Sequence, residues 1–193
     1  GTTLYIYGGG WDWQDVHSSN QTMTLGLPQS WVTFFQQQTA DYTYKDTNHP
    51  ENSYYPFGAW NQYYYAGADC SGYLGWVLYN TLYNINQTTA QNTGEVCAST
   101  SMAGNLAARG LGTLSRTVTP NSFRPGDIFS MNGHVWMCIG KCQDGSIVFV
   151  HSTPSESKTG KAGGGVQLSA LNPNGGQNCD AYRLAQQYMN TYY

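Results

Sequence analysis

The clearest pattern in this 193-residue chain is the segment DCSGYLGWVLYNTLY, residues 69–83. Its apolar side chains fall on one stripe at helical spacing, formed by Tyr73, Leu74, Val77, Leu78 and Leu82. The spacing predicts a helix over 70–83 with Cys70 in its first turn. Free N–H groups and the helix dipole stabilise an anion at that end. We therefore expect the pKa of the Cys70 thiol to lie below its ordinary value of about 8.5.

The other expected elements are shorter, and no internal repeat or boundary divides the chain. Helices are expected over 30–38 and 99–109. An Asp-Gly turn between two apolar runs predicts a hairpin. Strands are expected over 133–140, 146–151, 166–168 and 181–184. Helices followed by an antiparallel meander indicate a single α+β domain over residues 1–193.

The expected hairpin brings two of the four histidines together. His134 begins its first strand and His151 ends its second, so both lie at the same open end. One ring could take the proton of a nucleophile while the other holds it in the right tautomer. The alternative is a pair of surface histidines across two strands. His17 and His49 are expected in loops, on the solvated surface.

The five cysteines allow three interpretations: a free thiol, disulfide bonds or a metal site. The count of five is odd, which favours a free thiol at Cys70 over a buried or disulfide-bonded one. The other four, Cys97, Cys138, Cys142 and Cys179, allow three pairings. Zinc is a weaker alternative: His134, Cys138 and Cys142 recur every fourth residue, and four residues of strand span about 13 Å. That is too far for one ion unless the strand bulges, so no metal or cofactor is expected.

Composition excludes several classes of protein. Charged residues make up 10% of the chain, aromatic residues 15%, and the net charge is −3. A nucleic-acid binder needs a basic surplus, and a disordered chain has few aromatics. No apolar run approaches the roughly 20 residues of a membrane helix. The polar, charge-poor surface suggests an exported protein, extracellular or in the cell envelope, whose signal peptide has been removed.

Five short motifs, read together, resemble one family. They are Tyr5-Ile6-Tyr7-Gly8-Gly9, Asp69-Cys70-Ser71-Gly72, Arg124-Pro125-Gly126-Asp127-Ile128, Gly133-His134-Val135 and His151-Ser152. In this order they resemble the NlpC/P60 family of papain-like cysteine peptidases, which are bacterial cell-wall enzymes. The resemblance implies a papain-like fold in which the helix bearing the nucleophile packs on an antiparallel sheet. It also implies that Cys70 is the nucleophile, His134 the general base and His151 the residue that orients it.

The resemblance assigns substrate-binding positions as well. Tyr5 matches a tyrosine whose hydroxyl lies by the active site, and Asp69 and Ser71 match positions that hold the free amino end of the substrate. The family's Tyr-Gly-Gly segment normally lies shortly before the cysteine, whereas here about sixty residues intervene. Residues 11–65 therefore form an aromatic-rich insertion, expected to wall or cover the cleft, or else to pack as a flap on the far side.

The activity implied by the resemblance is hydrolysis of amide bonds in peptidoglycan stem peptides, most often the bond from D-glutamate to a diamino acid. Peptidoglycan or muropeptides would be the partner, and no oligomeric state is indicated. Three alternatives stay open: an amidase or acyl-transferring enzyme on another amide, a non-catalytic module that binds the cell wall, and a structural domain stapled by metal or disulfides.

Overall fold

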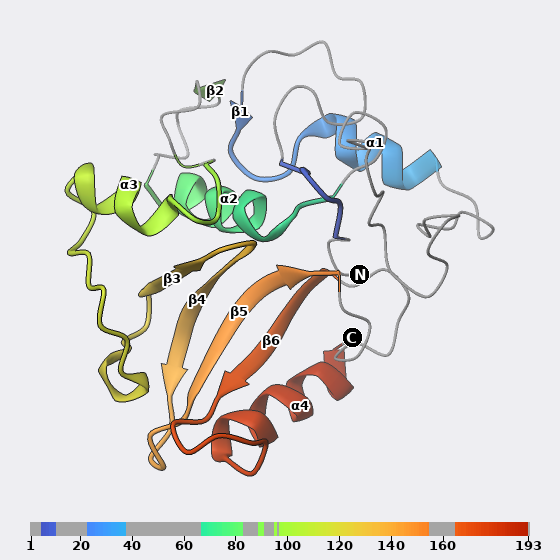
Figure 1. Cartoon of the computed structure of the whole chain (residues 1–193). Coiled ribbons are helices and arrows are strands. Elements are labelled where there is room, and N and C mark those ends of the chain that lie inside the picture. Colours follow the sequence, from blue (N-terminus) through green and yellow to red (C-terminus); the bar gives the residue numbers. More distant parts are fainter. Residues whose placement is uncertain are drawn as a thin grey trace.

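The computed structural model describes residues 5–10, 23–37, 67–82, 89–90, 95, 97–154 and 165–192. The architecture over these residues is α+β, as the sequence predicts: a four-stranded antiparallel sheet with helices packed on it (Figure 1). Within them no helix is both long and apolar enough to cross a membrane.

The sheet is a simple meander in the order β3-β4-β5-β6. Its strands are β3 (Ile128–Met131), β4 (His134–Lys141), β5 (Ile147–Thr153) and β6 (Gly165–Leu171). The predicted hairpin is confirmed as β4 and β5. Sequence reasoning missed β3, and β6 extends beyond the expected 166–168. Gly133 and Gly145 close the two hairpin turns at φ values of 78° and 82°, which glycine adopts without strain.

The first core cluster lies where two helices meet the sheet. Helix α2 (Cys70–Leu82) confirms the prediction over 70–83, and α3 (Met102–Ala108) lies within the predicted 99–109. The cluster consists of Cys70, Leu74, Met102, Leu106 and Val135. It accounts for part of the apolar stripe of α2: Leu74 is buried and Tyr73 and Leu78 pack on the cluster, whereas Leu82 is 45% exposed.

The C-terminal helix corrects the sequence analysis. The strand expected over 181–184 is wrong, because these residues belong to α4 (Asp180–Tyr192). Its buried residues, Ala181, Ala185 and Met189, recur every four positions, which is helical spacing. A window of four residues is too short to distinguish this period from the alternation of a strand. Helix α4 packs on β5 and β6, where Ala181 joins Val148 in a cluster.

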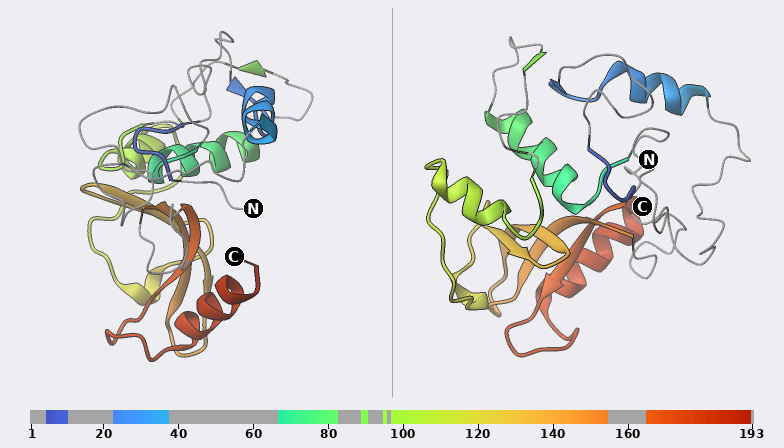
Figure 2. Two further views of the ribbon diagram at one scale, coloured as in Figure 1. Left: turned by 90° about the vertical axis from the view of Figure 1, so that its right-hand side faces the viewer. Right: turned by 45° about the horizontal axis from the view of Figure 1, so that its top comes forward.

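The described part of the insertion lies against the outer side of α2. Helix α1 (Gln29–Gln37) confirms the helix expected over 30–38, and its Trp31 is buried. Strands β1 (Met23–Thr24) and β2 (Thr89–Ala90) form a small separate pair. Gly26 accepts a hydrogen bond from the indole of Trp76 at 2.9 Å and donates one to Asn80 at 2.5 Å. Figure 2 shows α1 on the side of α2 that faces away from the sheet.

Candidate active site

The two histidines of the hairpin meet, as the sequence predicts. Nε2 of His134, the first residue of β4, lies 2.7 Å from Nδ1 of His151 on β5. The rings stand edge to face, with an interplanar angle of 72°. His151 is 9% exposed, and burial lowers the pKa of His134 below its ordinary value. A neutral His134 ring is therefore the favoured resting form.

A third polar group extends this pair. Nε2 of His151 lies 3.0 Å from Oγ of Ser169 on β6. Phe149 packs edge to face on the ring of His151, with 5.0 Å between the ring centroids. Trp136 in turn stacks on Phe149, with a centroid distance of 4.6 Å. Sequence reasoning missed Ser169, because a single serine in a short strand carries no signal and only the pairing of β6 with β5 brings it here.

Cys70 occupies the first position of α2 and is 5% exposed. Burial raises the pKa of its thiol to about 11, with a further contribution from the negative charge of Asp69. The N–H groups of Val135, Ser71 and Cys70 itself act in the opposite direction, but more weakly. The expectation of a thiol pKa below 8.5 is therefore wrong for the resting structure. Its helix-start position is correct, but loss of solvation outweighs the dipole.

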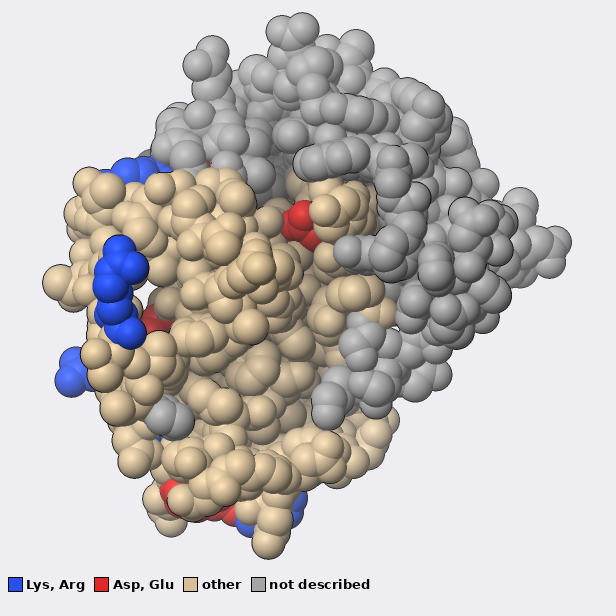
Figure 3. Space-filling model, viewed as in Figure 1, with Lys and Arg blue, Asp and Glu red and all other residues tan. Residues whose placement is uncertain are grey.

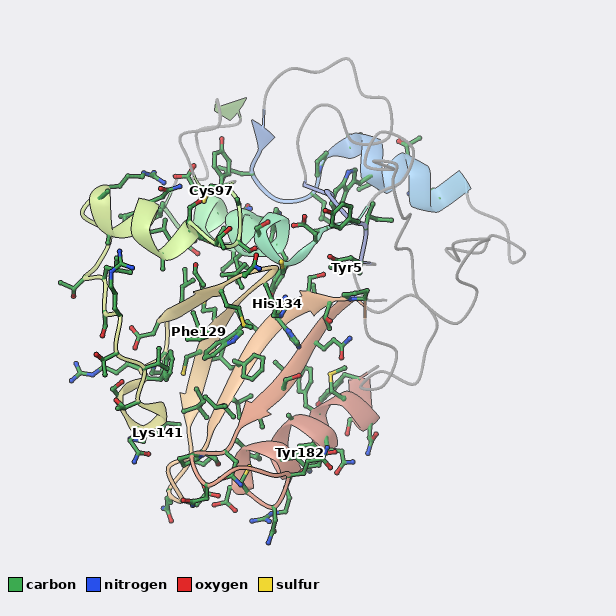
Figure 4. The ribbon with its side chains drawn as sticks, in the orientation of Figure 1. Tyr5, Cys97, Phe129, His134, Lys141 and Tyr182 are labelled. Atoms are coloured by element: carbon green, nitrogen blue, oxygen red, sulfur yellow. The ribbon has the colours of Figure 1, made fainter. Side chains whose placement is uncertain are left out.

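Two contacts tie the start of α2 to the histidine strands. The N–H of Val135 faces the sulfur of Cys70, and Val135 directly follows His134. The hydroxyl of Ser152, which follows His151, donates to the carbonyl of Ala68 at 2.7 Å. Each of these two contacts is thus made by the residue that directly follows a histidine. Figure 4 shows His134 between α2 and the sheet, near the end of the sheet that α2 covers.

Asp69 and Ser71 are bonded to each other at the start of α2. Oδ1 of Asp69 accepts hydrogen bonds from the N–H of Gly72 at 2.7 Å and from the hydroxyl of Ser71 at 3.0 Å. Burial raises the pKa of Asp69, while these donors lower it. Asp69 therefore caps the helix that carries Cys70. The sequence argument assigned it only a substrate contact, and this capping role was not anticipated.

The Tyr5 segment lies beside the nucleophile despite the long insertion. The N–H of Asp69 donates to the carbonyl of Gly9 at 3.0 Å. A Cβ on Gly72 would lie 2.0 Å from that same oxygen, so the two backbones touch. Tyr5 is buried, and Figure 4 shows it at the same end of the sheet as His134. The described residues on either side of residues 11–65 are therefore in contact with each other.

The other cysteines separate into different clusters. A bulge between Cys138 and Gly140 shifts the register of β4, so Cys138 packs with Trp136 while Cys142 packs with Cys179. Cys97 packs on the cluster that contains Cys70. All five are free thiols in the structure, and among Cys97, Cys138, Cys142 and Cys179 only Cys142 and Cys179 fall within one cluster. No three potential metal ligands come together among the described residues.

The described surface around the sheet carries little charge. In Figure 3 most described atoms on this face are uncharged, and Lys and Arg lie toward its edges.

The described part of the insertion contacts α2 far from Cys70. Trp76 and Asn80 follow Cys70 by six and ten residues, or about 9 and 15 Å along the helix. The side chain of Phe34, all of Trp60 and most of residues 11–65 lie outside the described residues, as do His17 and His49. The expectation of a wall or lid therefore stays a prediction.

No protein-family model matches this sequence, and no match exists among the curated proteins or the solved structures.

Proposed function

We propose that this chain is a papain-like cysteine peptidase of the NlpC/P60 kind that hydrolyses peptidoglycan stem peptides outside the cell. The proposed target is the amide bond from D-glutamate to a diamino acid. One observation carries the proposal: the two strands bearing His134 and His151, whose ring nitrogens lie 2.7 Å apart, are both tied to the helix start that bears Cys70. A thiol, a base and an orienting group are the parts that nucleophilic catalysis needs.

In this proposal the base is Nδ1 of His134. Nε2 of His134 is engaged with His151, which leaves Nδ1 to accept the proton of the Cys70 thiol. Burial raises the pKa of Cys70 and lowers that of His134, so both groups rest in their neutral forms. The proton therefore moves from sulfur to Nδ1 as the sulfur attacks the amide carbonyl.

The remaining steps follow from the same groups. Backbone N–H groups at the start of α2, including that of Cys70, would stabilise the oxyanion of the tetrahedral intermediate. The imidazolium of His134 then protonates the leaving amine, which breaks the C–N bond and leaves a thioester on Cys70. Water that gives its proton to His134 hydrolyses the thioester and releases the free thiol.

Substrate selection would depend on the groups around the helix start. Asp69 and Ser71 match family positions that hold the free amino end of a stem peptide, and Tyr5 matches a tyrosine whose hydroxyl lies by the active site. A carboxylate with a hydroxyl neighbour suits an ammonium group. We therefore expect a preference for fragments with a free amino end over capped ones.

The test is digestion of purified muropeptides, with products identified by mass spectrometry. The intact protein should release fragments with a new amino end, whereas Cys70→Ala should release none. Cys97→Ala is the matched control, because Cys97 packs on the same cluster without lying at the helix start. Full activity in a folded Cys70→Ala protein would refute the proposal. Binding to cell walls without any product would favour the binding-module alternative.

A further inference from the structure

Ser169, His151 and His134 form a chain of polar groups across three strands. The distances are 3.0 Å from Ser169 Oγ to His151 Nε2 and 2.7 Å from His151 Nδ1 to His134 Nε2. Phe149 packs edge to face on the ring of His151, and this contact favours the observed orientation of that ring.

A neutral His134 ring that can accept a proton on Nδ1 carries its hydrogen on Nε2 and already donates to His151, and protonation fixes this direction because it removes the other neutral tautomer, with hydrogen on Nδ1. Once His134 has accepted a proton on Nδ1, both of its nitrogens carry hydrogen, and Nε2 must donate. Nδ1 of His151 must then accept. A neutral His151 in that state carries its single proton on Nε2, which faces the hydroxyl of Ser169. The charged state therefore requires Ser169 to act as an acceptor.

We propose that Ser169 is a positioning residue of this site: its hydroxyl accepts the Nε2–H of His151 and so keeps Nδ1 of that ring as the acceptor for His134. The inference rests on the proposed function, because the protonated His134 that it serves is an intermediate of that reaction. Ser169 acts through His151, and no contact with substrate is needed.

In the part of the chain that the structure describes, the other ionisable groups on the elements beside His134 are few. Among the described residues, His151 on β5 contacts the ring of His134, Cys70 and Asp69 lie at the start of α2 beside the N–H of Val135, and Tyr5 lies at the same end of the sheet. On β3, the residue paired with His134 is Met131, which does not ionise. The variants below leave all of these groups unchanged.

The first experiment measures the histidines directly by ¹⁵N NMR and needs no turnover. A hydrogen bond to a neutral hydroxyl changes the equilibrium between charged and neutral His134 about five-fold, or roughly 0.7 pH unit. Ser169→Ala should lower the pKa of His134 by about that amount, and Ser169→Thr should restore it. Ser130→Ala is the matched control, because its hydroxyl lies in the same sheet but binds the N–H of Ala103 on α3. It should cause no shift.

The second experiment is the pH profile of kcat/KM. Because the reactive resting form has a neutral His134, protonation of that ring sets the acidic limb of the profile. In Ser169→Ala this limb should move to lower pH while the plateau falls about five-fold. A purely structural defect would lower the plateau without moving the limb.

The outcomes separate this inference from the proposed function. If no variant hydrolyses muropeptides, the proposed function fails, and the NMR measurement alone decides the role of Ser169. Equal pKa values of His134 in Ser169→Ala and Ser130→Ala would overturn the inference. Should Ser169→Ala not fold, the wild-type protein is decisive at low pH: protonation of His151 on Nε2 alone, with His134 charged, supports the role, and protonation on Nδ1 alone overturns it.

Discussion

Substitution of Gly72 by alanine tests the contact that brings the Tyr5 segment to the nucleophile. The new Cβ would lie 2.0 Å from the carbonyl oxygen of Gly9 and 3.1 Å from its carbon. Both are backbone atoms, which cannot move aside by a rotamer change, so residues 5–10 must shift as a segment. Gly104 in α3 offers the opposite case, because a Cβ there meets nothing within 4 Å.

Three contributions set the change in the free energy of unfolding that we expect for Gly72→Ala. Overpacking costs about 1–3 kcal/mol, and loss of the hydrogen bond from Asp69 to Gly9 costs about 1 kcal/mol. Replacing glycine in a helix returns up to about 1 kcal/mol. Gly72→Ala should therefore lose about 2 kcal/mol and melt roughly 4–8 °C lower, whereas Gly104→Ala should melt roughly 2–4 °C higher.

The assay is thermal unfolding of both variants, followed by circular dichroism, with muropeptide digestion in parallel. Gly72→Ala should also lose activity, because Tyr5 moves with its segment. If Gly72→Ala melts at or above the wild-type temperature, Gly9 does not pack against Gly72, and the placement of Tyr5 beside the site is wrong.

Two further predictions concern the reacting groups. His134→Ala should reduce kcat/KM about 10²–10⁴-fold, because one ring serves as base and acid, and His151→Ala should cost less; the reverse order in muropeptide kinetics would exchange their roles. Iodoacetamide reacts with the thiolate only, so the rate of labelling of Cys70 should rise with pH toward a midpoint of about 11. Asp69→Asn removes a negative charge that raises the pKa of this thiol and keeps a capping side chain, so its midpoint should be lower. A wild-type midpoint below about 8.5 would show that the thiol already rests as an ion pair.

The local sequence pattern was sufficient to predict the helix and the hairpin that carry the reacting groups. The stripe from Tyr73 to Leu82 predicted α2, and the turn at Asp144-Gly145 predicted the hairpin that joins His134 to His151. Both features depend on residues close in sequence, where side-chain period and turn chemistry act directly. The same reasoning failed for α4, because only the spacing from Ala181 to Met189 shows its helical period.

Tertiary structure alone decided the rest of the site. Ser169 reaches His151 because β6 pairs with β5, and Gly9 reaches Gly72 across an insertion of more than fifty residues. The thiol pKa of Cys70 shows the physical reason. Its position at a helix start is readable from sequence and lowers the pKa, but its burial against Val135 and the charge of Asp69 raise it further. Solvation depends on every element packed around a group, so no local pattern can report it.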